Sequence, residues 1–313
     1  MKKPTTPKLT FSQAIAGYDL YADARHLSIH TLADYHNTFR KFAATLPADL
    51  PISQITPDHV RGFLAAQTVS KKTILNYHAG LAALWTWAVK EGLAITHIVH
   101  EVEPPTPEKR AIVPFSEDDV RAMLNTIGHT RSYTRPGKVA SRHSLPTSDR
   151  NRAIILLLLD TGMRASELCE LPLRHCDLRN RQVKVFGKGS HERLLPICAR
   201  TAQAIWRYCS QFRKDETVDR PLFVTQNDNP LDRDQLLKSL HRIGQRAGVL
   251  DTHPHRFRHT FAINYLRNGG DPWSLQMMLG HTTMEMVRRY LAIAQADLNA
   301  SHRRASPVDN WKL

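Results

Sequence analysis

The residues best suited to chemistry gather between positions 253 and 290. His255 and Arg258 are three residues apart, so they project from one face of a predicted helix. His281 lies in a break between helices, beside a helix N-terminus whose free amides favour an anion. Tyr290 follows nine residues later. Two imidazoles, a guanidinium and a phenol that converge on one point indicate a phosphate-binding site with a tyrosine nucleophile.

Three predicted helices must position these groups. Pro254 suits the first turn of the first helix. Asp271, which a proline follows, is a typical N-cap for the second helix, and Gly280 is a typical end for it. Thr282 and Glu285 have the spacing of a capping box, which predicts the start of the third helix.

A second cluster of candidate residues surrounds Arg164. This residue follows the turn at Gly162 and opens a new helix, where an arginine beside free amides can clamp a phosphate. Glu167, three residues later, can reach back to cap this helix or to orient Arg164. A surface arginine at a helix start is the simpler explanation for Arg164 alone.

Residues 182–186 and 193–197 alternate β-branched and polar side chains on either side of a GKGSHE segment, a pattern typical of a β-hairpin. Lys188 lies near the predicted tip, between two glycines. A lysine at a hairpin tip is usually only solvated, but a rigid ribbon can also carry it toward a substrate.

Each motif is modest alone, yet TGMRxSEL, the GKG hairpin, HxxRH, LGH and a final tyrosine occur together and in order. Together they resemble the tyrosine recombinases (phage-type integrases, including the Xer-like site-specific recombinases). The resemblance covers roughly residues 10–295 and is strongest in the second half. It implies a catalytic set made of Arg164, Lys188, His255, Arg258, His281 and Tyr290, supported by Glu167.

The chemistry of phosphate transfer suggests how three of these residues would act. Arg164 and Arg258 would grip the two non-bridging oxygens and stabilise the pentacoordinate transition state. His281 would donate a further hydrogen bond to the same phosphate. With arginines and helix ends neutralising the charge, neither a metal nor a nucleotide cofactor is expected.

Tyr290 would attack a DNA phosphate, which the resemblance implies leaves a 3′-phosphotyrosine and a free 5′ hydroxyl. Lys188 would protonate the departing 5′ oxygen, and His255 would accept or position the proton of Tyr290. The 5′ hydroxyl of a partner strand would then attack the linkage, which gives strand exchange through a Holliday junction. The family often has a second lysine where this chain has His191, so a changed phosphate contact is expected there.

Other readings of the histidines remain open. HRFRH could be a solvated basic helix, and His255 with His259 has the i, i+4 spacing of a zinc-binding helix. No Cys, Asp or Glu accompanies this pair at ligand spacing, and HExxH is absent. The sequence therefore predicts no metal site.

Composition narrows the class of partner. The chain has 313 residues, a formal net charge of +14 and 42% hydrophobic residues, which predict two cored domains and a polyanionic partner. The longest apolar run, 153–159, is too short to span a membrane, and the residues after Met1 do not resemble a signal peptide. The four cysteines show no CxxC pairing, which favours reduced thiols in a cytoplasmic protein. Nucleic acid is therefore the favoured partner.

The first hundred residues predict a helical DNA-binding bundle. Residues 10–95 contain four helical patterns with their own start and stop signals. The fourth opens with Lys71 and Lys72, and His78 follows within two turns. This face suits a DNA backbone, and a solvated helix start explains it equally well.

The sequence therefore predicts two domains: an all-α, four-helix core-binding bundle (SAM-like) and a mainly α catalytic domain with a small antiparallel β-hairpin, the tyrosine recombinase catalytic fold. The predicted segments are a loose N-terminus (1–9), the bundle (10–95), a Pro-rich linker (96–114), the catalytic domain (115–295) and a basic C-terminal tail (296–313). Within the catalytic domain, residues 129–147 predict a basic loop with no periodicity.

The expected function is site-specific DNA recombination. The expected partners are double-stranded DNA with paired recombination sites and further copies of the chain in a tetrameric synapse, with accessory DNA-binding proteins as additional candidates and no membrane. Loop 129–147 and the basic tail favour integration or excision of a mobile element over Xer-type chromosome-dimer resolution. A type IB topoisomerase, a non-catalytic DNA-binding protein and a metal-dependent nuclease remain open as competing hypotheses.

Overall fold

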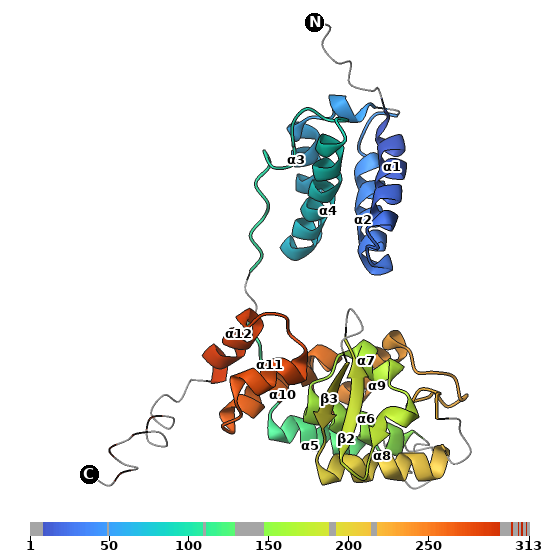
Figure 1. Ribbon diagram of the computed structural model, residues 1–313, viewed down its shortest axis with the longest axis vertical. Coiled ribbons are helices and arrows are strands. Elements are labelled where there is room, and N and C mark those ends of the chain that lie inside the picture. Colours follow the sequence, from blue (N-terminus) through green and yellow to red (C-terminus); the bar gives the residue numbers. More distant parts are fainter. Residues whose placement is uncertain are drawn as a thin grey trace, which may run out of the picture. The chain divides into compact units, whose positions relative to one another are not determined.

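The chain folds as two compact units, Met1–Ala111 and Ile112–Leu313, which are described separately (Figure 1). The computed structural model describes residues 9–48, 50–108, 111–128, 147–187, 192–213 and 218–294, and positions 302, 306, 308 and 311. Lys188, His191 and most of the predicted 129–147 loop lie outside the described residues.

The N-terminal unit is a bundle of four α-helices. They are α1 (Phe11–Ala24), α2 (Ile29–Ala43), α3 (Pro57–Ala65) and α4 (Lys71–Lys90), with a single 3-10 turn, η1 (Ile52–Gln54), before α3. The cap expected at the start of α1 is present, because Thr10 and Gln13 each donate a backbone N–H to the other's side-chain oxygen. Phe11, Phe42 and Trp85 pack ring against ring in a core that these helices enclose.

The linker prediction is wrong for its first part. Ile98, Val99 and Val102 fall within the expected 96–114 linker, but all three are buried in the core of the N-terminal unit. His78 on α4 fastens this segment, because its Nε2 lies 3.1 Å from the carbonyl oxygen of Val99 and 2.8 Å from that of Val102. The N-terminal unit therefore extends past α4, because three apolar side chains of the predicted linker are buried in its core.

The C-terminal unit is mainly helical, with a three-stranded antiparallel sheet in the order β1-β2-β3. Its elements are α5 (Glu117–Thr126), α6 (Ser148–Thr161), α7 (Ala165–Glu170), η2 (Leu173–His175), β1 (Cys176–Asp177), β2 (Gln182–Phe186), β3 (Glu192–Pro196), α8 (Ala199–Phe212), α9 (Arg233–Ala247), α10 (Pro254–Arg267), α11 (Pro272–Leu279) and α12 (Glu285–Ala294). The expected hairpin is confirmed as β2 and β3, in which Val183 pairs with Leu195 and both are buried. The sequence pattern does not predict the short strand β1.

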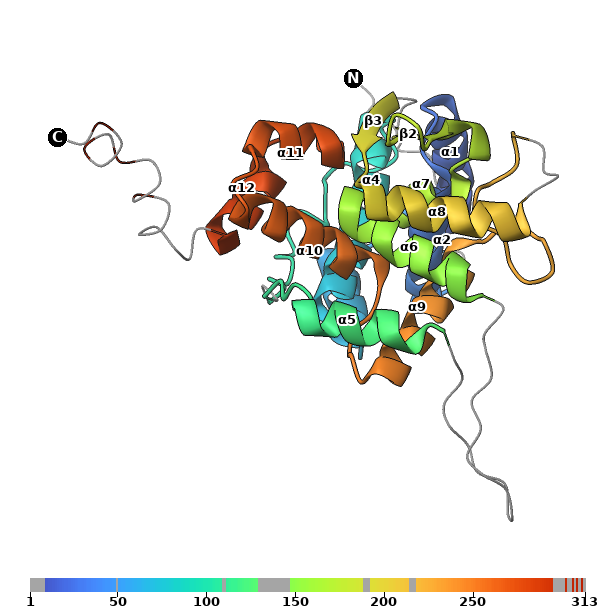
Figure 2. The ribbon, with the colours of Figure 1, turned by 90° about the horizontal axis from the view of Figure 1, so that it is seen from below.

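Helix α10 holds the C-terminal unit together. It packs against α6 on one side and against α12 on the other, while α11 also contacts strand β3 (Figure 2). The predicted ends of α11 are confirmed, since Asp271 accepts a hydrogen bond from the backbone of Ser274 and Gly280 has a left-handed φ of 63°. The capping box predicted at Thr282 and Glu285 is wrong, because α12 begins only at Glu285.

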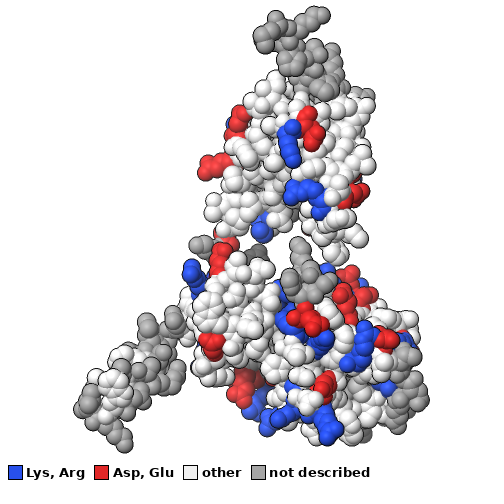
Figure 3. Space-filling model, in the orientation of Figure 1, with Lys and Arg blue, Asp and Glu red and all other residues white. Residues whose placement is uncertain are grey.

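Charged side chains of both signs are scattered over one face of the C-terminal unit (Figure 3). On the face seen in Figure 3, Lys and Arg lie among Asp and Glu. Along the described parts of the chain, no helix has both the length and the apolar character needed to cross a bilayer.

Candidate active site

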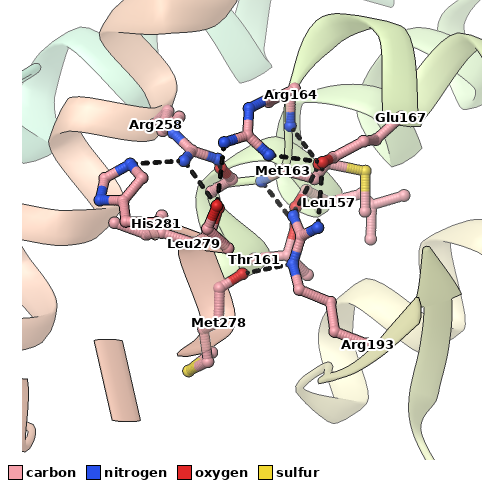
Figure 4. Close-up of polar contacts among 12 residues, drawn as sticks. Leu157, Thr161, Met163, Arg164, Glu167, Arg193, Arg258, Met278, Leu279 and His281 are labelled. Carbon is pink, nitrogen blue, oxygen red and sulfur yellow. Dashed lines mark hydrogen bonds and ion pairs between the residues drawn. The ribbon is translucent and has the colours of Figure 1, made fainter. Parts of the chain in front are cut away.

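Three arginines converge on the carboxyl end of α11. Arg193 Nε donates to the carbonyl oxygen of Met278 at 2.8 Å, Arg258 Nη2 to that of Leu279 at 2.8 Å, and Arg164 Nη2 to that of Gly280 at 3.1 Å. Figure 4 shows the guanidinium groups gathered around this helix end. The last carbonyls of a helix lack partners within it and form the negative end of its dipole, so they suit cationic donors. Guanidiniums from three distant segments are therefore fixed by three consecutive carbonyls.

The carboxylate of Glu167 joins two of these arginines. Arg193 reaches it with Nη1 at 3.0 Å and Nη2 at 2.7 Å, and Arg164 reaches it with Nη1 at 2.9 Å and with its backbone N–H at 2.7 Å. Burial alone would raise the pKa of the Glu167 carboxyl, but the hydrogen bonds from Arg193 and Arg164 outweigh burial and hold that pKa below its ordinary value. Glu167 thus both caps α7 and orients Arg164, the two tasks expected of it.

Arg258 is the most deeply buried of the three, with 4% of its surface exposed. Besides Leu279, it donates from Nη1 to the carbonyl oxygen of Gly162 at 2.8 Å. Burial, with the nearby charge of Arg164, lowers the pKa of Arg258 to about 10, so the guanidinium remains charged at neutral pH. Its remaining N–H groups have no partner among the described residues, and they are available to an anion.

Gly162 allows this close approach. Its φ of 60° is left-handed, and an added Cβ would collide with the ring of Phe261 on α10. The end of α6 can therefore turn sharply into α7, which places Arg164 beside Arg258.

His281 follows α11 directly and completes the cluster. The imidazole Nε2 of His281 lies 2.8 Å from Arg258 Nη2. Gln276 fixes the backbone of His281: the carbonyl oxygen of Gln276 accepts from the His281 N–H, and the side-chain amide of Gln276 donates to the His281 carbonyl oxygen. Burial, with the charges of Arg258 and Arg164, lowers the pKa of His281 to about 4, so the ring is neutral and Nε2 accepts from the guanidinium. The proton then resides on Nδ1, which is buried and has no hydrogen-bond partner in the described part of the chain.

Tyr290 lies on the inner face of α12, with 1% of its surface exposed. Its ring stacks near that of His281, with 6.5 Å between centroids and 16° between planes. Its hydroxyl lies 2.8 Å from Nδ1 of His259, which is on α10. Burial raises the pKa of Tyr290, although the charges of Arg258 and Arg289 oppose the shift. The phenol is therefore neutral, hydrogen-bonded and close to the arginine cluster.

The structure thus brings together Arg164, Glu167, Arg258, His281 and Tyr290. His255, at the start of α10, is exposed, and its ring lies 6.5 Å from that of His259. The described residues contain no group of three His, Cys, Asp or Glu side chains placed to hold a metal ion.

The three described residues expected to bind DNA divide into two kinds. Lys71 and Lys72 are exposed at the start of α4, and Lys71 lies 3.7 Å from Glu108. His78 does not share their surface, because its ring is buried and binds the segment that follows α4. The expectation for His78 is therefore wrong, and its role is in packing.

Comparison with known proteins identifies the family of this chain. The model of the phage integrase family matches residues 138–297, and that of the phage integrase N-terminal SAM-like domain matches residues 15–92. The tyrosine recombinase XerC of Staphylococcus carnosus is 30% identical over 292 residues, which cover 90% of this chain and 93% of that protein. The chain belongs to the phage integrase family of tyrosine recombinases.

Other members of the integrase family match over similar lengths. The tyrosine recombinase XerD of Pseudomonas aeruginosa is 29% identical over 92% of this chain and 96% of its own length. Among solved structures, the Tn1549 transposon integrase in complex with transposon right end DNA superimposes with a TM-score of 0.73. It is 21% identical and covers 95% of this chain and all of that one, which supports the fold.

Two residues of this candidate site are missed by sequence reasoning. The sequence pattern marks Arg193 only as part of a strand, and His259 only as half of a zinc-like pair. Arg193 lies on the same face of β3 as the buried Leu195, so the alternating pattern marks it only as a packed position of a strand. The position of His259, one helical turn after His255, is the one local hint that a second imidazole shares the site.

Proposed function

We propose that this integrase-family chain cleaves and rejoins DNA at specific sites through a 3′-phosphotyrosine on Tyr290. The observation that carries the proposal is the position of a buried tyrosine beside a preassembled cluster of three arginines and a neutral histidine. Such a cluster suits a phosphodiester, because it offers fixed positive charge and directed N–H donors in a site with little water.

Arg164 and Arg258 would hold the non-bridging oxygens of the scissile phosphate. Arg164 has N–H groups left after it binds Glu167 and the carbonyl oxygen of Gly280, and 36% of its side chain is accessible. Arg258 also has N–H groups left after it binds Gly162, Leu279 and His281. An arriving phosphate would also compete for the bond between Arg258 and His281. Its negative charge would raise the pKa of His281, and the ring could then donate to a phosphate oxygen.

In the cleavage step, the phenol of Tyr290 gives its proton to a neighbouring imidazole and its oxygen forms a bond to phosphorus, as the bond from phosphorus to the 5′ oxygen breaks. Lys188, from the tip segment between β2 and β3, would give its proton to that oxygen. Attack by the 5′ hydroxyl of a second strand reverses the step and joins new ends. His255, which is exposed and within electrostatic reach of Arg258 and Arg164, would contact the phosphate, and His191 would contact DNA.

The proposed partners are duplex DNA with paired sites and further copies of this chain, because strand exchange needs four strands cut in turn. For biological role we propose integration or excision of a mobile element, as the basic 129–147 insertion and basic tail suggest. Relatives named XerC and XerD make chromosome-dimer resolution the second candidate. Inverted-repeat core sites and element ends in the DNA flanking the gene would favour the first role, and their absence the second.

The central test is Tyr290→Phe, which removes one oxygen and keeps the buried ring. A nicked duplex carrying the core site should trap the parent protein as a denaturation-resistant, protease-sensitive adduct, and the variant should give none while it binds DNA as the parent does. An adduct with the variant, or one mapped to another residue, would refute the assignment. Relaxation of supercoiled DNA that lacks paired sites would favour a topoisomerase, and loss of cleavage in chelator would favour a metal-dependent nuclease.

A further inference from the structure

Among the described residues, the imidazole that forms a hydrogen bond with the Tyr290 hydroxyl is that of His259. Nδ1 of His259 lies 2.8 Å from the phenol oxygen across the contact between α10 and α12. Because the tyrosine is 1% exposed, this hydrogen bond takes the place of water at the phenol. The nucleophile of the proposed reaction is thus paired before any DNA arrives.

His255 is placed differently, although the sequence pattern assigns it the proton of Tyr290. It lies one helical turn before His259, its ring centroid is 6.5 Å from that of His259, and the residue is exposed. Its hydrogen-bond partners within the described ranges do not include Tyr290. The geometry therefore separates an exposed histidine, suited to the substrate, from a half-buried one that touches the nucleophile.

We propose that His259 is a catalytic residue: its Nδ1 holds the Tyr290 hydroxyl in place and accepts the phenol proton during attack on the phosphate. This inference rests on the proposed function. As the oxygen–phosphorus bond forms, the phenol O–H breaks and its proton moves to Nδ1. The 5′ oxygen leaves with its electron pair and takes a proton from the general acid. Rejoining returns the proton from His259 to the phenol oxygen.

The surroundings keep His259 in the form that can accept a proton. His253, His255 and Arg258 face it from α10, Arg289 and Tyr290 from α12, and His281 lies beyond the tyrosine ring. Burial, with these imidazoles and guanidiniums, lowers the pKa of His259 to about 4, so the ring is neutral at pH 7. A phosphodiester bound to the arginines would offset part of the positive charge and strengthen the base.

The test compares two amide variants of the full-length protein. In His259→Asn the side-chain amide occupies the position of Nδ1, so it can hold the phenol but cannot take its proton. In His259→Gln the side-chain amide lies one bond further from the backbone, at the position of Nε2, so it does not replace the Nδ1 contact with the phenol. The matched control is His253→Asn at the N-cap of α10, where asparagine is a favoured cap. The assay is the rate of adduct formation on DNA with a 5′-bridging sulfur at the cleavage site, a leaving group that needs no general acid.

At pH 7 both His259 variants should cleave about 10²–10⁴-fold more slowly than the parent, and His253→Asn should cleave at the parent rate. The parent rate should be level between about pH 6 and pH 8, because the neutral base is fully available above its pKa. In His259→Asn the rate should instead rise in proportion to hydroxide, since only preformed phenolate then reacts. A packing role alone would lower the rate without changing this pH dependence.

Two results would overturn the inference while the proposed function stands: an adduct on Tyr290 that His259→Asn forms at the parent rate, or a parent rate that already rises with hydroxide. The second result needs no variant, so the inference remains testable if both substitutions unfold the protein. Absence of any Tyr290 adduct in the parent would instead refute the proposed function itself.

Discussion

Arg193→Lys tests whether the bidentate contact of Arg193 holds the site together. The arginine makes two hydrogen bonds to Glu167, at 3.0 and 2.7 Å, and a third to the carbonyl oxygen of Met278 at 2.8 Å, with 13% of its side chain exposed. Lysine keeps the charge but has one nitrogen, which cannot span the carboxylate and also reach the carbonyl. The substitution therefore removes geometry and leaves charge nearly unchanged.

The magnitude follows from the hydrogen bonds that lysine cannot make. A hydrogen bond to a charged group contributes about 1.5–3 kcal/mol, and Arg164 continues to hold Glu167 after the change. Loss of one carboxylate bond and the Met278 bond should thus lower the free energy of unfolding by about 3–6 kcal/mol. For a unit of this size, each kcal/mol lowers Tm by roughly 2–4 °C, so we expect a decrease of about 6–24 °C.

Differential scanning calorimetry of the full-length protein measures this shift in the transition of the C-terminal unit. The matched control is Arg200→Lys on α8, an exposed arginine, where the free energy of unfolding should change by no more than about 0.5 kcal/mol. A decrease in Tm for Arg193→Lys no larger than that of the control would show that the bidentate contact adds nothing to stability. A larger decrease, with weaker binding of site DNA, would support its role in orienting the site.

Three further outcomes can be measured. Lys188→Ala should slow cleavage of ordinary DNA about 10²–10⁴-fold yet cleave DNA with a 5′-bridging sulfur nearly as well as the parent, and equal defects on both substrates would remove Lys188 from the acid role. Changing Lys71 and Lys72 to Ala should make the salt dependence of DNA binding shallower by up to about one to two units of slope, unless this face is not in contact with DNA. In the folded protein the pKa of His281 is lowered from 6.5 to about 4. As pH falls from 6.5 to 4, this histidine is therefore protonated in the unfolded chain but not in the folded one, and the free energy of unfolding decreases. Urea unfolding of His281→Asn should therefore be less sensitive to pH in this range, and an unchanged pH dependence would contradict the assigned neutral ring.

Local signals in the sequence predict the elements of this fold well. Caps at Thr10 and Asp271, the left-handed Gly280 and the β2–β3 hairpin all appear where their residue types predict them. Each depends on interactions within a few residues, which the sequence displays directly. The capping signal at Thr282 gives the wrong helix start. Threonine is a good cap residue, yet the chain continues for two more residues before α12 begins.

The parts that could not be predicted depend on contacts between distant residues. Arg193 meets Glu167 across 26 positions, and His259 meets Tyr290 across 31. Nothing in the local pattern distinguishes these side chains from neighbours of the same type. His78 shows the converse error, because a polar residue near two lysines suggests a surface, while its contacts with Val99 and Val102 bury it.

The end of α11 explains how this cluster of like charges is stable without a ligand. Three guanidiniums would repel one another, and Glu167 is their only carboxylate partner among the described residues of the site. Three consecutive carbonyls at the negative end of a helix supply the remaining stabilisation, and the left-handed Gly280 ends the helix there. Helix carbonyls carry only partial charge, so the cluster keeps a net positive charge even when its geometry is fixed. A phosphodiester would supply the missing negative charge without requiring the arginines to move, and under the proposed function such preorganised donors would stabilise the further charge that develops in the transition state.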